Sequence, residues 1–168
     1  DRIIVLRQGK VQQHGTPFHI YKRPENVFVA HFVGNSNFFE GIVTQRSRDA
    51  SVIRLRGNLK LKVSDTSHET EEAVIVTVRE EQTHILPMLG VDDVIDLPGK
   101  ISAVRFLGSF TRYEVSLVNG DRLASKVPVD TSRMMLNPGD RVMVSIDPSD
   151  TLLYEYPTLG LKRELEVY

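Results

Sequence analysis

Histidine is a common metal ligand, and the chain carries it at five positions: His14, His19, His31, His68 and His84. Gly15 and Pro17 interrupt the one close pair, and the other histidines lie far apart in the sequence. This is not the spacing of a ligand set on one helix or hairpin. Cysteine is absent, which removes thiolate ligands, thiolate nucleophiles and disulfides together. No metal site is expected.

The residues that could support catalysis or nucleotide binding are also not spaced for it. No serine stands in a nucleophile-elbow pattern. The paired carboxylates Glu80-Glu81 and Asp92-Asp93 fall beside predicted turns, where solvated charge is the usual explanation. Gly99-Lys100 is followed by isoleucine and has no partner glycine at the required upstream spacing, so it is not a phosphate-binding loop. The chain by itself is therefore expected to be neither an enzyme nor a holder of any cofactor.

The strongest chemical signal is a basic stretch with little opposing charge: Arg46, Arg48, Arg54, Arg56, Lys60 and Lys62. Its last four members alternate with Ile53, Leu55, Leu59 and Leu61, which predicts one apolar and one cationic face. Nucleic-acid-binding barrels add aromatic side chains for base stacking, yet none lies between Phe39 and Phe106. A solvated outer face is favoured over an oxyanion or phosphate-rich ligand, and both are favoured over nucleic acid.

The bulk composition is that of an ordinary globular protein. Of the 168 residues, 40% are hydrophobic and 26% are charged, and the net charge is −1. No overall field therefore draws the chain to nucleic acid or to an anionic membrane. No apolar run approaches the roughly 20 residues that a membrane-spanning helix needs.

The first 36 residues predict a hairpin and two short helices. The hairpin joins the apolar run Ile3 to Leu6, through a glycine turn, to a second run ending at Gln13. A run without polar alternation predicts a strand buried on both faces, which indicates that the sequence is cut from a larger chain. One helix begins at Pro17, capped by Thr16, and ends before Pro24. A second is predicted from Pro24 through Phe32.

From Phe38 onward the sequence predicts β-structure almost throughout. Two-residue turn signals occur at Gly57-Asn58 and Asn119-Gly120. The segment FEGIVTQ is echoed by PGKISAV, and EEAVIVTVREE by GDRVMVSIDPS. We therefore predict a mainly β protein, with a small barrel or sandwich built from two similar β units. The predicted organisation is a hairpin-and-helix part over 1–36, a β domain over 37–157 and a tail over 158–168.

The opening resembles the end of the nucleotide-binding domain of ABC importer ATPases, the group of the maltose, polyamine, ferric iron and sulfate importers. The resemblance is carried by five motifs in the family's order: Asp1-Arg2-Ile3, Gly15-Thr16-Pro17, Pro24-Glu25-Asn26, Phe28-Val29-Ala30 and Phe32-Val33-Gly34. The remainder is similar to the OB-like regulatory TOBE domain of the same ATPases, with three further motifs: Asn37-Phe38-Phe39-Glu40-Gly41, Val78-Arg79-Glu80-Glu81 and Leu107-Gly108. Glu80 stands where the family usually has proline.

This resemblance implies that the phosphate loop, the signature segment and the catalytic carboxylate lie upstream of Asp1. The intact protein would bind ATP and Mg²⁺ and work at the cytoplasmic face of the inner membrane. It would act as a homodimer and drive solute import through membrane permease subunits. The β domain would hold the two copies together and, as in some members of the family, could bind a small-molecule or oxyanion regulator. The alternatives are a free-standing oxyanion-binding module and an OB-type nucleic-acid-binding domain.

Two sets of residues are predicted to do this work. The first, a surface for a regulator or partner, comprises Arg79, Glu80, Glu81, Arg54, Arg56, Lys60 and Lys62. The second, packing residues at the joint between the two domains, comprises Phe28, Phe32 and Tyr21.

Overall fold

The computed structural model describes residues 1–87, 97–129 and 135–166. Its N-terminal hairpin pairs β1 (Ile3–Arg7) with β2 (Lys10–Gly15). The turn residues Gln8 and Gly9 have φ angles of 51° and 75°, as in the turns that match strand twist. The hairpin was predicted, but the burial on both faces expected for its first strand is not found within this chain. Only Val5 of the apolar run is buried, and Ile4 is 61% exposed, because the two short helices cover one face alone.

Both helices follow their capping residues. In α1 (Pro17–Lys22), the Thr16 hydroxyl accepts a hydrogen bond from the His19 N–H, as the sequence predicted. The second helix, α2 (Val27–Phe32), begins three residues later than predicted, because the Asn26 side chain accepts from the Val29 N–H at 2.9 Å and fixes the start there. We call β1, β2, α1 and α2 the N-terminal unit.

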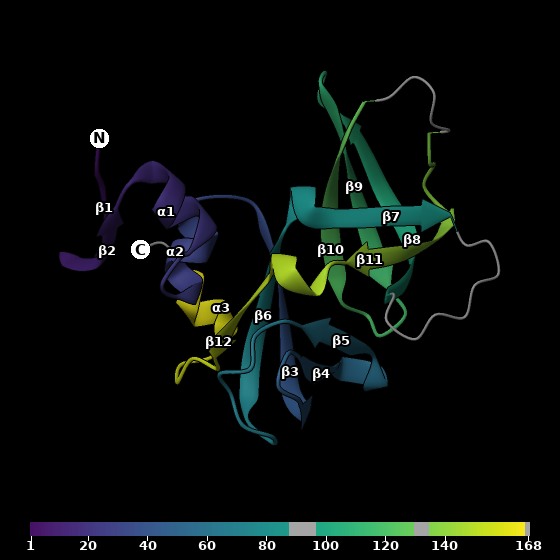
Figure 1. Ribbon diagram of the computed structural model, residues 1–168. Helices are drawn as coiled ribbons and strands as arrows, with labels where there is room; N and C mark the ends of the chain where they lie inside the picture. Colours follow the sequence, from purple (N-terminus) through teal and green to yellow (C-terminus); the bar gives the residue numbers. More distant parts are fainter. Residues whose placement is uncertain (88–96, 130–134, 167–168) are drawn as a thin grey trace.

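The rest of the chain folds into two five-stranded antiparallel sheets (Figure 1). The first has the order β12-β6-β3-β4-β5: β12 (Thr151–Glu155), β6 (Ala73–Arg79), β3 (Ser36–Arg46), β4 (Ser51–Leu55) and β5 (Lys60–Val63). The second has the order β10-β9-β8-β11-β7: β10 (Arg122–Pro128), β9 (Phe110–Leu117), β8 (Leu97–Phe106), β11 (Arg141–Ile146) and β7 (Thr83–Pro87). Three single-turn 3₁₀ helices, η1 (Arg56–Asn58), η2 (Glu80–Gln82) and η3 (Pro148–Asp150), and a short helix α3 (Leu161–Glu164) complete the described elements.

The two sheets are copies of one unit that exchange their last strands. The order β6-β3-β4-β5 is repeated as β11-β8-β9-β10. Strand β7 follows β6 in the chain but pairs with β11, whereas β12 follows β11 but pairs with β6. The predicted echo is thus confirmed, since its segments lie in β3 and β8 and in β6 and β11. The exchanged strand β7 was not predicted from the sequence.

The duplication extends to two glycines. A Cβ added at Gly41 would lie 2.4 Å from Ile53 Cγ2, and one added at Gly99 would lie 2.6 Å from Val115 Cγ1. Each would also meet a carbonyl oxygen of the neighbouring strand, at 3.0 Å and 2.9 Å respectively. Both glycines therefore permit a close approach of two strands at equivalent places in the two units.

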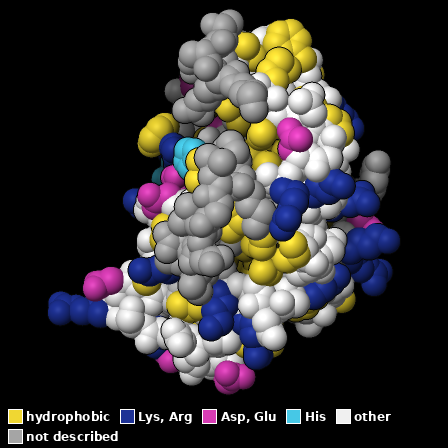
Figure 2. All heavy atoms as spheres, turned by 90° about the vertical axis from the view of Figure 1, so that its right-hand side faces the viewer, with side chains coloured by type: hydrophobic (Ala, Val, Ile, Leu, Met, Phe, Trp, Pro, Cys, Tyr) yellow, Lys and Arg dark blue, Asp and Glu magenta, His cyan; other side chains and the backbone are white. Residues whose placement is uncertain are grey.

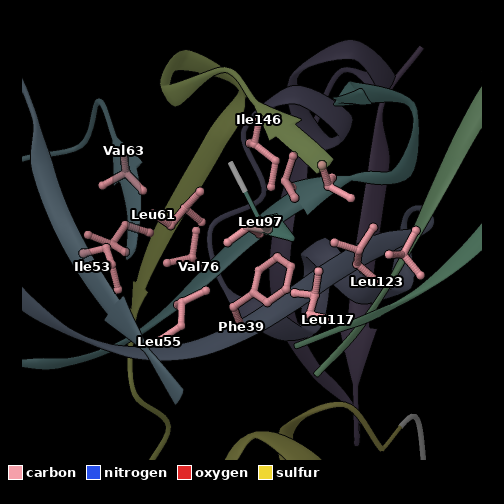
Figure 3. Packing of buried hydrophobic residues seen from close by; sticks show 14 of the residues in the cluster. Phe39, Ile53, Leu55, Leu61, Val63, Val76, Leu97, Leu117, Leu123 and Ile146 are labelled. Atoms are coloured by element: carbon pink, nitrogen blue, oxygen red, sulfur yellow. The ribbon is translucent and has the colours of Figure 1, made fainter. Parts of the chain in front are cut away.

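One continuous hydrophobic core joins the sheets (Figure 3). Phe39, Ile53 and Val76 of the first sheet pack in the same cluster as Leu97 and Leu117 of the second. Both sheets contribute to this one core. The prediction of a mainly β protein, with two similar units packed as one body, is therefore confirmed. The N-terminal unit has a separate small core made by Val5, Ile20, Phe28 and Val29. Across the described ranges, no helix has the length and apolar character to span a membrane.

Candidate functional site

Arg79, at the end of β6, fastens the N-terminal unit to the first sheet. Its guanidinium donates from Nη1 to the Ala30 carbonyl at 2.9 Å and from Nη2 to the Tyr21 carbonyl at 3.0 Å. These two carbonyls lie near the C-terminal ends of α2 and α1, where backbone acceptors lack partners within the helix and a cation is favoured. Only 7% of Arg79 is exposed, and Nη1 also reaches the Ser36 hydroxyl at 2.8 Å.

Tyr21 lies between Arg79 and the acidic turn that follows β6. The Arg79 guanidinium stands 4.4 Å from the centre of the Tyr21 ring, in a cation–π contact. The Tyr21 hydroxyl donates to a carboxylate oxygen of Glu81. Burial, followed by this hydrogen bond to Glu81, raises the pKa of the Tyr21 hydroxyl. Gly34 makes room for the arrangement, because a Cβ there would lie 2.8 Å from Arg79 Nη1.

Glu80 points to the other side of the same turn and pairs with Arg112 of β9. The two side chains form a bidentate ion pair, with Nε to Oε2 at 2.9 Å and Nη2 to Oε1 at 2.8 Å. Glu80 is 4% exposed. Hydrogen bonding to Glu80 raises the pKa of the Arg112 guanidinium. The pair joins the turn that ends the first unit to the second sheet.

The twin turn explains how glutamate can replace the proline expected at position 80. Residues 74–78 of β6 and 142–146 of β11 pair with equivalent strands in their two units: Val74 lies opposite Gly41, and Val142 lies opposite Gly99. By the same alignment, Glu80 in η2 corresponds to Pro148 in η3. Thr83 Oγ1 donates to the Glu80 carbonyl at 2.8 Å, and Thr151 Oγ1 donates to the Pro148 carbonyl at 2.6 Å. The same turn therefore accepts either residue, and glutamate adds the ion pair.

The cationic stretch forms the predicted two-sided strands but not a site with the residues above. Ile53, Leu55 and Leu61 are buried, while Arg54, Lys60 and Lys62 are exposed on the opposite face. These three cations have no ion-pair or hydrogen-bond partner within the described residues, and Arg56 lies 3.9 Å from Asp121. Figure 2 shows Lys and Arg side chains grouped along one edge of the face that it displays.

The three aromatic residues predicted to pack at the joint lie in different surroundings. Phe28 packs inside the small core of the N-terminal unit, where it stacks on Phe32 with ring centres 5.8 Å apart. Phe32 itself is 53% exposed. Tyr21 does lie at the joint, but through its polar contacts with Arg79 and Glu81. The joint depends on a buried arginine and not on apolar side chains at a regular spacing, so hydrophobic periodicity in the sequence could not predict it.

Other contacts at the joint were not found from the sequence. The Tyr154 hydroxyl of β12 donates to the Pro24 carbonyl at 2.9 Å. Arg7 of β1 pairs with Glu164 of α3 at 2.6 Å, so the segment expected to be a tail packs against the hairpin, and α3 lies on the same side of the molecule as the N-terminal unit (Figure 1). A further contact that was not predicted lies between the two sheets, away from the joint. The Asn37 side-chain amide donates to the Ala124 carbonyl at 2.8 Å and accepts from the Ala124 N–H at 2.7 Å. Single polar residues carry no periodic signal, so sequence patterning could not select them.

A cavity of about 160 Å³ opens beside Arg79, between the N-terminal unit and the turns η2 and η3. Its wall includes Lys22, Thr77, Arg79, Glu81 and Asp150. Among the described residues, no group of three or more His, Asp or Glu side chains is placed to hold a metal ion.

Comparison with known proteins agrees with this architecture. The model of the TOBE domain family matches residues 76–153. The chain is 34% identical over 166 residues to the spermidine/putrescine import ATP-binding protein PotA of Rubrobacter xylanophilus, a match that covers 97% of this chain and 42% of that protein. It is 37% identical over 125 residues to PotA of Trichormus variabilis, covering 71% of this chain and 32% of that protein. The matched part of the chain thus spans 32% to 42% of the length of these relatives.

A solved structure extends the comparison to the fold. The cytoplasmic molybdate-binding protein ModG, determined with molybdate bound, superposes with a TM-score of 0.63 at 18% identity. The superposition covers 72% of this chain and 96% of ModG, so the two share the OB-like β architecture. Taken with the TOBE match and the likeness to PotA across both the N-terminal unit and the sheets, this chain belongs to the TOBE-containing C-terminal regions of ABC importer ATP-binding proteins.

Proposed function

We propose that this chain is the regulatory and dimerisation region of the ATP-binding subunit of an ABC importer. The observation that carries the proposal is the similarity to PotA over 97% of the chain, because it includes the N-terminal unit as well as the sheets. In the intact protein, ATP with Mg²⁺ is hydrolysed outside this region, at the cytoplasmic face of the membrane. Hydrolysis drives solute import through permease subunits, and the sheets hold two copies of the subunit together.

The joint supports a role in transmitting movement between the sheets and the ATPase. Arg79 carries two hydrogen bonds from the first sheet to the N-terminal unit, and the Tyr154 hydroxyl adds a third, to the Pro24 carbonyl between α1 and α2. A regulator can change transport only by favouring one state of the protein over another, typically by about 1 to 3 kcal/mol. A connection made through a few directed polar contacts can pass such a preference from one body to the other.

Reconstitution tests the proposal directly. The full-length protein carrying this region is combined with its permease in proteoliposomes, and ATP hydrolysis and putrescine uptake are measured together. Putrescine is the probe because the similar proteins are named for spermidine/putrescine import. We expect Arg79→Met to keep ATP hydrolysis but to lose most uptake per ATP. Arg54→Met, which removes an exposed cation without a partner, is the matched control.

Two outcomes would overturn the proposal. One is a wild-type complex that neither hydrolyses ATP nor moves polyamine. The other is an Arg79→Met complex with the same uptake per ATP as Arg54→Met. Dimerisation is tested separately by analytical ultracentrifugation of the full-length protein with and without residues 37–157, because the proposal requires dimers to weaken when the sheets are removed.

A further inference from the structure

The cavity beside Arg79 has the position and the lining of a small-molecule site. It lies where the N-terminal unit meets the sheets, and clefts between packed bodies are common ligand sites. Residues from α1, β6, η2 and η3 contribute to its wall. Its volume of about 160 Å³ equals that of about five liquid water molecules, which is room for a ligand of several non-hydrogen atoms.

Two cations on the wall have no carboxylate of their own. Arg79 gives its three hydrogen bonds to uncharged oxygens, and its Nε–H has no partner among the described residues. Lys22, at the end of α1, has neither an ion pair nor a hydrogen bond within those residues. A buried guanidinium without a counter-ion is costly, so an anionic group placed here would be favoured.

Thr77 provides an independent sign of a ligand. Its side chain is almost completely buried, at 2% exposure, and its hydroxyl has no hydrogen-bond partner among the described residues. Among the described residues, Ser51 Oγ is the one side-chain polar atom that is inaccessible to solvent and also lacks a hydrogen-bond partner. Since the Thr77 hydroxyl lacks a partner but is not in that class, it keeps some accessible surface, and this surface faces the cavity that Thr77 lines. Buried polar groups normally have partners, and here the partner must come from inside the cavity.

Two carboxylates, of Glu81 and Asp150, also line the cavity, and they restrict which anion could bind. Glu81 belongs to η2 and Asp150 to η3, whereas the two cations come from α1 and β6. A multiply charged anion such as phosphate would be repelled by the two carboxylates. A ligand with one negative and one positive group would satisfy both parts of the wall.

We propose that this cavity binds a small zwitterionic amino acid. Its carboxylate accepts hydrogen bonds from Arg79 Nε–H and Lys22, its ammonium group lies toward Glu81 and Asp150, and the Thr77 hydroxyl bonds to one of these ends. The ligand would contact the N-terminal unit and the sheets at once. It would therefore favour one arrangement of the two bodies, although binding itself does not depend on the transport role proposed above.

Calorimetric titration of the 168-residue chain at neutral pH tests the proposal with L-alanine as the probe. Acetate and methylamine, which carry one charged group each, are titrated in parallel, and inorganic phosphate serves as a multiply charged anion. We expect millimolar or tighter binding of alanine and at least tenfold weaker binding of the other three. Heat from none of them, or equal binding of acetate and alanine, would overturn the proposal.

Variants that leave the fold intact locate the site. Thr77→Val removes a hydroxyl that makes no bond within the described residues, and we expect about fivefold to tenfold weaker alanine binding. Lys22→Met should weaken binding by a similar factor. Ser145→Ala is the matched control, because Ser145 holds the twin position in β11 and does not line this cavity. Alanine binding that Thr77→Val and Lys22→Met leave unchanged would place the ligand elsewhere and refute the assignment.

Discussion

The ion pair between Glu80 and Arg112 should have a large and strongly non-additive effect on stability. The perturbations are Arg112→Met, Glu80→Leu and the double variant. The Glu80 side chain is 5% exposed and the Arg112 side chain is 26% exposed, so the carboxylate is the more deeply buried partner. Arg112→Met leaves that carboxylate without a counter-charge and removes both of its hydrogen bonds.

The magnitude follows from this asymmetry. Removing one partner of a fully buried pair costs about 3 to 5 kcal/mol. Since Arg112 is partly exposed, we expect the lower end, about 3 kcal/mol, for Arg112→Met. Glu80→Leu should cost less, about 1 to 2 kcal/mol, because Arg112 keeps its hydrogen bond to Glu114 at 2.9 Å. The double variant should be less destabilised than Arg112→Met, giving a coupling energy of about 2 kcal/mol.

Urea unfolding followed by circular dichroism supplies the four free energies of the cycle. Arg105→Met is the matched control, since Arg105 also contacts Glu114, at 3.1 Å, but is 62% exposed. It should change stability by no more than about 0.5 kcal/mol. The reasoning is refuted if Arg112→Met is no more harmful than Arg105→Met, or if the effects of Glu80→Leu and Arg112→Met simply add.

Three further outcomes test the sheets and the joint. Gly41→Ala and Gly99→Ala should each lower the free energy of unfolding in urea by about 1 to 3 kcal/mol, because the added methyl group overlaps the neighbouring strand. Similar losses at both sites would support the duplication, and no loss at either would contradict the close approach of the strands. Asn37→Leu should cost about 2 kcal/mol by the same measurement, since it leaves both backbone groups of Ala124 without partners, and a neutral result would contradict the bridging role. Burial raises the pKa of Tyr154 above its ordinary value of 10.0, so the protonated form is favoured in the folded chain: its contribution is complete below pH 10.0 and falls as pH rises beyond it. Stability measured across alkaline pH should therefore fall less steeply in Tyr154→Phe.

The sequence was informative where structure depends on periodicity or on local turn chemistry. Alternation predicted which side chains of β4 and β5 face the core, and Thr16 marked the start of α1 correctly. The start predicted for α2 at Pro24 is wrong, because Asn26 caps the helix and Val27 is its first residue. Strand alternation and helix capping each depend on residues within a few positions of one another, so they can be predicted without knowing the tertiary contacts.

The joint could not be predicted because it depends on contacts between distant parts of the chain. The sequence predicts Arg79 as a surface residue for a regulator, yet it is buried against carbonyls that lie 49 and 58 residues earlier in the chain. Glu80 was treated as a departure from the family pattern, and its buried partner Arg112 had no distinguishing feature in the sequence. Charged residues are normally exposed, so burial of two charges in neighbouring positions has no simple sequence signal.

The three residues 79–81 connect the N-terminal unit, which has its own core, to both sheets of the β domain. Arg79 holds the ends of both short helices, Glu81 holds Tyr21, and Glu80 between them holds the second sheet through Arg112. The next strand, β7, is the one exchanged into the second sheet, so this turn is also where the chain crosses from one β unit to the other. A shift of the N-terminal unit that moved Arg79 or Glu81 would therefore displace a segment that is fixed to both sheets. Because the segment is short and polar, such a shift must either be transmitted to the sheets or break a buried contact, and the second alternative has a free-energy cost that the Glu80–Arg112 cycle measures.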